Sequence, residues 1–192
     1  GRDAEERAAR ESSVLRSCAA SGVSVPEVIA SRGHVIVLSH IQGENAMSLL
    51  DGIWAEYADD DRQRNAASSH VLLSISGWLS RFHDAFGHAT ARGDSILKNF
   101  LVTDYGIVGL DFEESSASDP VQDLGQLCAS LLSSRPMFTP WKLALARGIR
   151  DEYSRLSGTD VSEALPDSIA RALVHYGRFR SDGLELITWA ER

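Results

Sequence analysis

Apolar residues recur at helical spacing along much of the chain. The clearest run lies between Arg64 and Phe86 and predicts the longest helix; its apolar positions are Val71, Leu72, Ile75, Trp78, Leu79 and Phe82. A charged, alanine-rich segment over residues 3–20 predicts a first helix that Ser21 and Gly22 would end. Three further helices are expected over residues 121–132, 141–156 and 166–176, with Pro120 in the first turn of the earliest.

Short apolar and β-branched runs predict two hairpins. Residues 25–30 and 34–39 flank a Ser-Arg-Gly segment that suits a turn. Residues 100–102 and 107–110 flank a second turn, in which Asp104 and Gly106 favour a tight reversal of the chain. Residues 40–45 lack periodicity, so we interpret them as a linker into a short amphipathic piece.

Composition and charge narrow the class of protein. The 192 residues suffice for one well-buried domain, and no apolar run approaches the roughly 20 residues of a membrane span. Residues 1–13 lack the apolar core of a signal peptide, so a cytoplasmic location is expected. Cys18 and Cys128 lie far apart in helical patterns, which indicates buried thiols without a disulfide or zinc site. The net charge of −8 argues against direct DNA binding and membrane association.

The segment RGDSILKNFLVTDYGIVGLDF, from Arg92 to Phe112, carries the candidate chemistry. Asp94 is followed five residues later by Asn99, and Asp111 comes twelve residues after that, beyond the second hairpin. Phosphoryl transfer needs one carboxylate at the attacking hydroxyl, while an amide oxygen and a second carboxylate hold Mg²⁺ against nucleotide phosphates. Singly, each residue would be an ordinary loop or strand-end residue. Together they predict catalytic Asp94 and Asn99 and a metal site at Asn99 and Asp111.

With these residues in place, the chain resembles the protein-kinase-like superfamily, and within it the aminoglycoside phosphotransferases and the RIO-like atypical kinases. Those families carry His-Gly-Asp, four residues, Asn, a hairpin, and then Asp-Phe-Glu or Asp-Phe-Gly; here the match is RGDSILKN and DFE. The resemblance implies an α+β, protein-kinase-like fold. A partial N-terminal lobe would span residues 1–42, and a mostly helical C-terminal lobe would span residues 43–192.

The resemblance also assigns roles outside this motif. Glu11 would be the helix glutamate that pairs with a strand lysine at the nucleotide. At the adenine-binding hinge, the Ser39 carbonyl and the Ile41 amide would meet the adenine edge, and Leu38 would line the pocket. Asp123, in a segment similar to the families' Asp-Pro-x-x-Asp-Leu, would accept hydrogen bonds from catalytic-loop amides; a helix-start carboxylate favoured by the helix dipole is the alternative.

Three further positions qualify this interpretation. Lys98 is a candidate phosphate ligand, and a solvated loop lysine is the alternative. Arg92 stands where the families have a histidine that braces the catalytic loop, so it would be a structural support. No glycine-rich loop and strand lysine precede the first helix, so Glu11 has no visible lysine partner. We expect a longer parent protein in preference to a naturally reduced member, because the helix and hairpin would otherwise leave a sheet edge and face uncovered.

The expected function is an ATP-dependent phosphotransferase that uses ATP and Mg²⁺ and moves the γ-phosphate to a hydroxyl of a small molecule or a protein. Two alternatives stay open: a RIO-like kinase or ATPase subunit of a tRNA-modification complex with protein partners, and a catalytically weak pseudokinase scaffold. An aminoglycoside acceptor would predict a strongly acidic pocket. Acids such as Asp151 and Asp167 offer such charge, but a solvated helix face explains them equally well.

Overall fold

The structure is a computed structural model that describes residues 2–191. The helices are α1 (Arg2–Ala20), α2 (Ala46–Glu56), α3 (Asp61–Ala85), the 3₁₀ helix η1 (Leu97–Asn99), α4 (Val121–Ser133), α5 (Pro140–Ser157), α6 (Leu165–Gly177) and α7 (Gly183–Ala190). The strands are β1 (Val28–Arg32), β2 (Val35–Leu38), β3 (Glu44–Asn45), β4 (Thr90–Ala91), β5 (Phe100–Thr103), β6 (Gly106–Gly109) and β7 (Ser116–Ala117).

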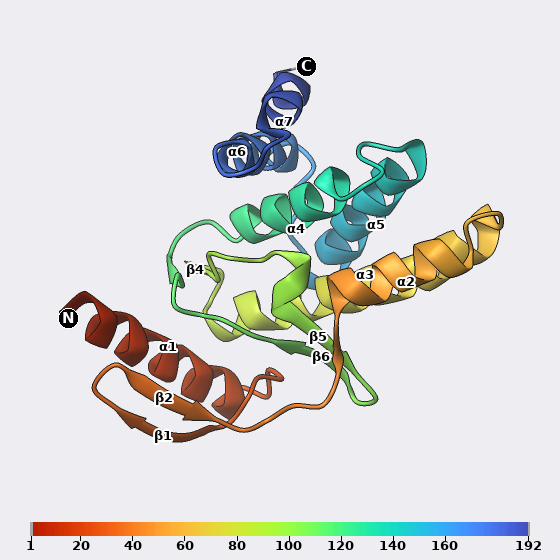
Figure 1. Cartoon of the computed structure of the whole chain (residues 1–192). Coiled ribbons are helices and arrows are strands. Elements are labelled where there is room, and N and C mark those ends of the chain that lie inside the picture. Colours follow the sequence, from red (N-terminus) through yellow and green to blue (C-terminus); the bar gives the residue numbers. More distant parts are fainter. Residues whose placement is uncertain (1, 192) are drawn as a thin grey trace.

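The helices form most of the molecule, and the sheets are small (Figure 1). α1 lies beside the hairpin of β1 and β2 at one end, and α6 and α7 lie at the other. Between them, α3 packs on α5, and α4 packs on α6. The hairpin of β5 and β6, in the candidate catalytic segment 92–112, lies between the α1 end and the larger helical part (Figure 1).

Three antiparallel pairings build the sheets. β1 pairs with β2, β5 lies between β3 and β6, and β4 pairs with β7. In the central sheet, Leu101 lies opposite Val108, as expected for a hairpin whose turn is centred on residues 104 and 105. β4 and β7 flank the segment that holds the catalytic loop, the second hairpin and the loop after it.

An aromatic core holds this segment against the longest helix. Trp78 and Phe82 of α3 are fully buried and stacked, with ring centroids 5.6 Å apart. Phe100 at the start of β5 and Phe112 after β6 are also fully buried, with centroids 5.6 and 6.1 Å from Trp78. Burial of such rings contributes about 2 kcal/mol each. The two segments that carry Asn99 and Asp111 are thus packed against α3 through Phe100 and Phe112.

The structure confirms most of the expected elements. Several elements differ from the prediction, each for a physical reason. The first strand begins at Val28, since Pro26 has no amide hydrogen for a strand ladder. The linker contains β3, which forms only because β5 lies beside it. Helix α7 was not expected; its eight residues are too few to establish a period, and Leu186 is buried against α6. Both cysteines are buried and free, as expected.

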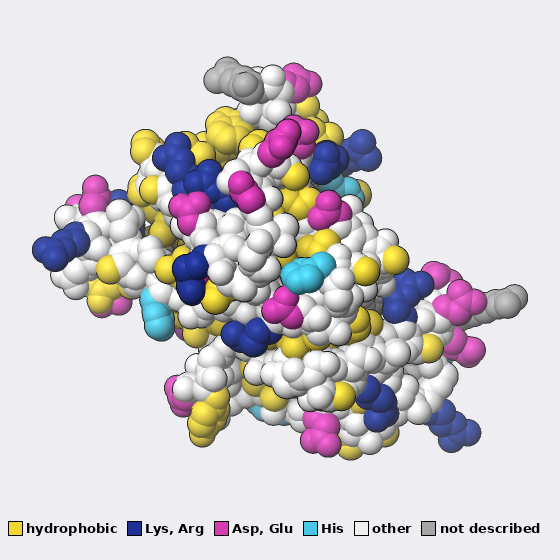
Figure 2. Space-filling view, turned by 180° about the vertical axis from the view of Figure 1, so that it is seen from behind, with side chains coloured by type: hydrophobic (Ala, Val, Ile, Leu, Met, Phe, Trp, Pro, Cys, Tyr) yellow, Lys and Arg dark blue, Asp and Glu magenta, His cyan; other side chains and the backbone are white. Residues whose placement is uncertain are grey.

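Charged side chains of both signs are interspersed over the face shown in Figure 2. This mixture is typical of a solvated protein surface and accompanies the net charge of −8. Within residues 2–191, none of the helices combines the length and the apolar character that a membrane crossing requires.

Lys142 of α5 is a fully buried cation between helices. Its Nζ donates to the carbonyl oxygen of Ser134 at 2.6 Å and to the Ser134 hydroxyl at 2.7 Å. The ammonium also lies 4.2 Å from the centroid of the Trp54 ring, a cation–π contact. Burial lowers the pKa of Lys142 from 10.5 to about 8, although the charge of Asp51 opposes this shift.

We expect Lys142 to make stability depend on alkaline pH. The folded pKa is depressed, so the unfolded chain binds more protons between about pH 8 and 10.5 and the free energy of unfolding rises with pH through this window. The difference in unfolding free energy between wild type and Lys142→Met, measured by urea denaturation at pH 7.5, 9 and 10.5, should move in favour of the wild type. Lys98→Met, at an exposed lysine, should show no such trend.

Candidate active site

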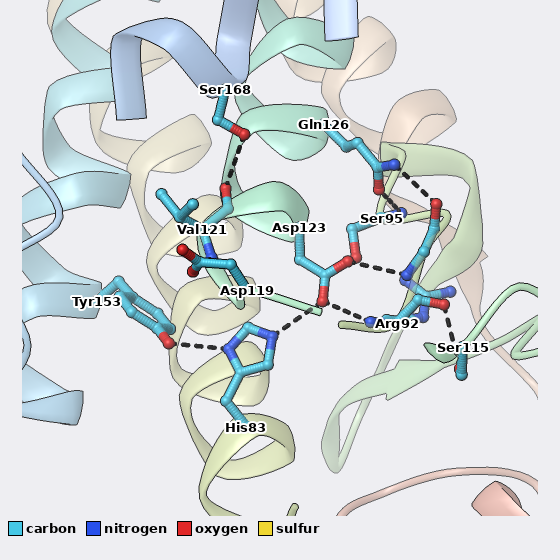
Figure 3. A network of polar contacts seen from close by, with 11 residues as sticks. His83, Arg92, Ser95, Ser115, Asp119, Val121, Asp123, Gln126, Tyr153 and Ser168 are labelled. Atoms are coloured by element: carbon cyan, nitrogen blue, oxygen red, sulfur yellow. Dashed lines mark hydrogen bonds and ion pairs between the residues drawn. The ribbon is translucent and has the colours of Figure 1, made fainter. Parts of the chain in front are cut away.

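The loop between β4 and β5 carries Asp94 and Asn99, and α4 holds its backbone (Figure 3). Asp123 accepts hydrogen bonds from the amides of Arg92 and Gly93, at 2.7 and 3.1 Å. Gln126 accepts from the Ser95 amide at 2.8 Å and donates to the Gly93 carbonyl at 2.7 Å. The loop conformation is therefore fixed by side chains of one helix.

The side chains of α4 that bond the loop follow helical spacing. Asp123, Gln126 and Ser130 share one face of the helix, and Ser130 accepts a hydrogen bond from the Leu97 amide at 3.2 Å. Sequence reasoning identified only Asp123 and missed Gln126 and Ser130. The signal was present, because three polar residues interrupt the apolar positions of a buried helix at i, i+3 and i+7.

Asp123 is itself held by a buried chain of hydrogen bonds. His83 of α3 lies with Nε2 2.9 Å from the Asp123 carboxylate and Nδ1 2.9 Å from the hydroxyl of Tyr153 in α5. All three side chains are almost completely shielded from solvent. The chain joins three helices to the catalytic loop, and buried polar networks of this kind fix one arrangement when every member is satisfied.

Asp94 and Asn99 are in direct contact. The Asn99 amide nitrogen donates to the Asp94 carboxylate at 2.8 Å and to the Asp94 carbonyl at 3.1 Å. Burial raises the pKa of Asp94, while the hydrogen bond from Asn99 and the charge of Arg92 lower it; the charges of Asp111 and Glu114 add to the rise. With its pKa raised, the ionised carboxylate is a better proton acceptor than a free one.

Gly93 is required where it stands, directly before Asp94. Its φ of 92° lies in the left-handed region, which side chains rarely adopt. A Cβ at this position would also collide with the backbone carbonyl of Glu114. The close approach of these two backbones brings the catalytic loop against the segment that follows Asp111.

Arg92 is completely buried beneath the two loops. Its Nη2 donates to the carbonyls of Asn99, at 3.2 Å, and Leu110, and lies 3.4 Å from that of Asp111. Its guanidinium carbon lies 4.6 Å from the Phe100 ring centroid. Burial lowers the pKa of Arg92 to about 10, so it remains charged at neutral pH. Arg92 thus connects the end of the catalytic loop to the segment that carries Asp111.

Asp111 follows β6 with a φ of 60°, which is uncommon for a residue with a side chain. The next amide, that of Phe112, donates to the Glu11 carboxylate of α1 at 3.3 Å. Burial raises the pKa of Glu11, and the charges of Asp111 and Glu113 raise it further. Within residues 2–191, Glu11 forms no ion pair with a lysine; it contacts the Asp111 segment instead.

The remaining predicted residues divide between two regions. Glu11 and Leu38 line one cavity of about 270 Å³ between α1 and β2. In the hinge, Ser39 is tied to Glu27 by its amide and its hydroxyl, both at 2.9 Å; among the described residues, the Ser39 carbonyl and the Ile41 amide have no backbone partner. Lys98 is exposed and lines a different cavity, away from Glu11.

The oxygen atoms of Asn99 and Asp111 fit Mg²⁺, an ion that needs only a few protein ligands. Within the described part of the chain, no group of three or more His, Cys, Asp or Glu side chains is placed to hold an ion. The Asn99 amide nitrogen is used by Asp94, which leaves its oxygen without a partner among described residues, and Asp111 is exposed. Two hard oxygen donors suit Mg²⁺, which takes its other ligands from water and phosphates.

The fold and the arrangement of these loops are similar to the kinase-like fold, and the comparisons with known proteins agree on the fold. The model of the RIO domain matches residues 3–71, a segment that ends before the catalytic loop. Among solved structures, WaaP in complex with acyl carrier protein is similar with a TM-score of 0.55 and 17% identity, over 96% of this chain and 74% of that one. No curated protein sequence matches. The expected protein-kinase-like fold is thereby confirmed.

Proposed function

We propose that this chain is an ATP-dependent phosphotransferase that moves the γ-phosphate of ATP to an acceptor hydroxyl. One observation carries the proposal: Asp94 and Asn99 are hydrogen bonded on a loop that Arg92 connects to the segment of Asp111. A structural loop has no need for two carboxylates and a free amide oxygen at this junction. Phosphoryl transfer needs all three.

The chain's own residues supply positioning and proton transfer. Asp94 accepts the proton of the acceptor hydroxyl as the hydroxyl oxygen bonds to the γ-phosphorus; the bond from this phosphorus to the bridging oxygen breaks, and ADP leaves. The raised pKa of Asp94 suits that task. Asn99 orients the Asp94 carboxylate through its amide nitrogen. The Asn99 oxygen and the Asp111 carboxylate would hold Mg²⁺. When bound, this ion neutralises charge on the transferred phosphate.

The nucleotide would lie between the two ends of the molecule. We assign the adenine edge to the Ser39 carbonyl and the Ile41 amide, with Leu38 beside it, because these backbone groups have no protein partner among the described residues. Glu11 borders the cavity next to the hinge. In this arrangement residues 1–42 act as an N-terminal lobe and residues 43–192 as a C-terminal lobe, and Lys98 stays a candidate phosphate contact.

The acceptor, location and partners complete the proposal. We place the protein in the cytoplasm, acting on a small molecule or a protein without binding DNA. A protein partner is also part of the proposal, since WaaP is described in complex with acyl carrier protein. A RIO-like role in a tRNA-modification complex draws support from the RIO-domain match.

A pseudokinase scaffold is the second candidate, and one observation favours it. Glu11 has no lysine partner among the described residues and binds a backbone amide instead. Kinases depend on that ion pair to hold the nucleotide phosphates. A scaffold would keep the fold and the contact between Asp94 and Asn99 without turnover, so nucleotide binding and turnover must be measured separately.

The experiment that tests the proposal is titration calorimetry of ATP with and without Mg²⁺. We expect Mg²⁺-dependent binding in the wild type and at least about tenfold weaker binding in Asp111→Asn, which loses a metal-binding charge. Asp104→Asn removes the same charge from the exposed turn of the same hairpin and serves as the control.

Two results would count against the phosphotransferase. Folded wild type that shows no Mg²⁺-dependent binding would leave only the scaffold. Equal effects of Asp111→Asn and Asp104→Asn would mean that the change reflects net charge and not a metal ligand.

A further inference from the structure

A second cavity is lined by residues of the loop that carries Asp94, and it shares no lining residue with the cavity of Glu11 and Leu38. Its volume is about 460 Å³, and it is bounded by Ile96 and Lys98 of the loop, by α2, by the end of α4 and by the segment after α6. This volume is within the range of small-molecule sites. Of the residues given nucleotide roles above, only Lys98 lines this cavity.

The wall of this cavity is coupled to Asp94. Tyr176 of α6 lines the cavity and donates its hydroxyl to the Gln126 carbonyl at 3.3 Å, and the Gln126 side chain holds the amide and carbonyl that flank Asp94. Burial raises the pKa of Tyr176, and the charge of Asp94 raises it further, as expected for two groups within electrostatic reach. Tyr176 and Gln126 therefore connect the wall of the cavity to the backbone on both sides of Asp94.

The charge of the lining is opposite to that of the whole protein. The chain has a net charge of −8, yet Lys98 and Arg180 line the cavity against the single carboxylate of Asp51. Arg180 forms an ion pair with Asp182, whose carboxylate lies 2.8 Å from Nε, and its Nη2 donates to the Ser133 carbonyl at 3.1 Å.

A further cation, Lys142, contacts the lining from the protein interior. The buried ammonium of Lys142 donates to the hydroxyl and the carbonyl of Ser134, which lines the cavity.

The acids of α5 do not contribute negative charge to this cavity. Asp151 is paired with Arg150, and Glu152 is paired with Arg155, each at 2.7 Å. They are not among the residues that line this cavity.

We propose that this cavity binds the acceptor, and that the acceptor is a small polyol carrying a phosphate or carboxylate group besides the hydroxyl that is phosphorylated. Lys98 and Arg180 bind the anionic group, and serine hydroxyls at the end of α4 bind the polyol. An ammonium-rich acceptor would place its cations against these side chains, which is unfavourable at short range. This inference rests on the proposed function and extends it to the class of acceptor.

The test is calorimetric binding to the full chain without nucleotide, using glycerol 3-phosphate, gluconate, glycerol and kanamycin. We expect one or both anions to bind at least about tenfold more tightly than glycerol, with kanamycin weakest. The phosphate and carboxylate probes separate the two kinds of anion. Arg180→Gln should weaken anion binding at least about fivefold. Arg178→Gln, two residues away and outside the cavity, should not.

Tighter binding of kanamycin than of either anion would overturn the proposal. So would anion binding that is absent, or that Arg180→Gln and Arg178→Gln leave equally unchanged. Thermal denaturation of both variants checks that Arg180→Gln still folds, since Arg180 also contacts Ser133; binding is compared at a temperature where both are folded. Because nucleotide is left out, a failed acceptor class leaves Mg²⁺-dependent ATP binding intact, whereas failure of the proposed function removes that binding.

Discussion

Asp94→Asn is expected to lower phosphate transfer by about 10²- to 10⁴-fold while Mg²⁺-dependent ATP binding stays close to wild type. The amide of asparagine cannot accept the hydroxyl proton, so the reaction loses its base. Asp94 does not belong to the proposed metal site, which consists of Asn99 and Asp111. The measurement pairs a transfer assay, which follows γ-³²P from ATP into the acceptor, with calorimetry on the same sample.

Glu114→Gln is the matched control for this variant. Glu114 is exposed, and its charge acts on Asp94 without contacting it among the described hydrogen bonds. Removing this charge lowers the pKa of Asp94 slightly, so transfer should persist. A Glu114→Gln variant as inactive as Asp94→Asn would show that local charge, and not the base, limits the reaction.

The pH dependence of phosphate transfer provides an independent test of Asp94. The proposed base Asp94 would act only when ionised, and burial raises its pKa above the ordinary value of 3.8. Transfer should therefore fall as the pH decreases through this raised pKa. In Asp94→Asn the remaining activity should lose that acidic limb. If the limb persists unchanged in the variant, another group controls the protonation step.

The sequence predicted the parts of the site that local geometry determines. Asp94 and Asn99 are five residues apart in one loop, so the short helical turn of η1 suffices to bring them into contact. The hairpin of β5 and β6 follows from its turn residues and apolar strands. Motif spacing therefore indicated the reactive groups, although their roles remain proposals.

Contacts between distant segments had no such signal. Glu11 meets the Phe112 amide across 101 positions, whereas the resemblance to kinases implied a strand lysine as its partner. The buried position of Arg92 was unreadable, because its partners are backbone carbonyls that any residue can supply. A sequence shows side-chain types, whereas a backbone acceptor becomes specific only when tertiary packing positions it.

Asp123→Ala should produce the largest loss of stability, about 3–5 kcal/mol in the free energy of unfolding. The substitution leaves the amides of Arg92 and Gly93 and the Nε2 of His83 without their buried acceptor. Each such group costs about 1–3 kcal/mol when unsatisfied. Asp123 also provides the largest electrostatic support for the buried Arg92 cation.

Urea denaturation monitored by tryptophan fluorescence measures this loss, and Asp119→Ala is the control. Asp119 is exposed, and its side chain accepts one hydrogen bond, from the Val121 amide at 2.9 Å, so removal of the side chain should cost only about 1 kcal/mol. Similar losses in the two variants would contradict the role of Asp123 as the anchor of the loop. If Asp123→Ala does not fold, Asp123→Asn retains one acceptor oxygen and should show an intermediate loss.

Asp123→Asn also tests whether Asp123 only positions the catalytic loop or takes part in proton transfer. Asp123 lies in no proposed contact with ATP or acceptor, so its effect on transfer must act through the loop amides of Arg92 and Gly93. Asp123→Asn at a temperature where it is fully folded should therefore reduce transfer while keeping the acidic limb that belongs to Asp94. Loss of that limb would mean that Asp123 takes part in proton transfer itself.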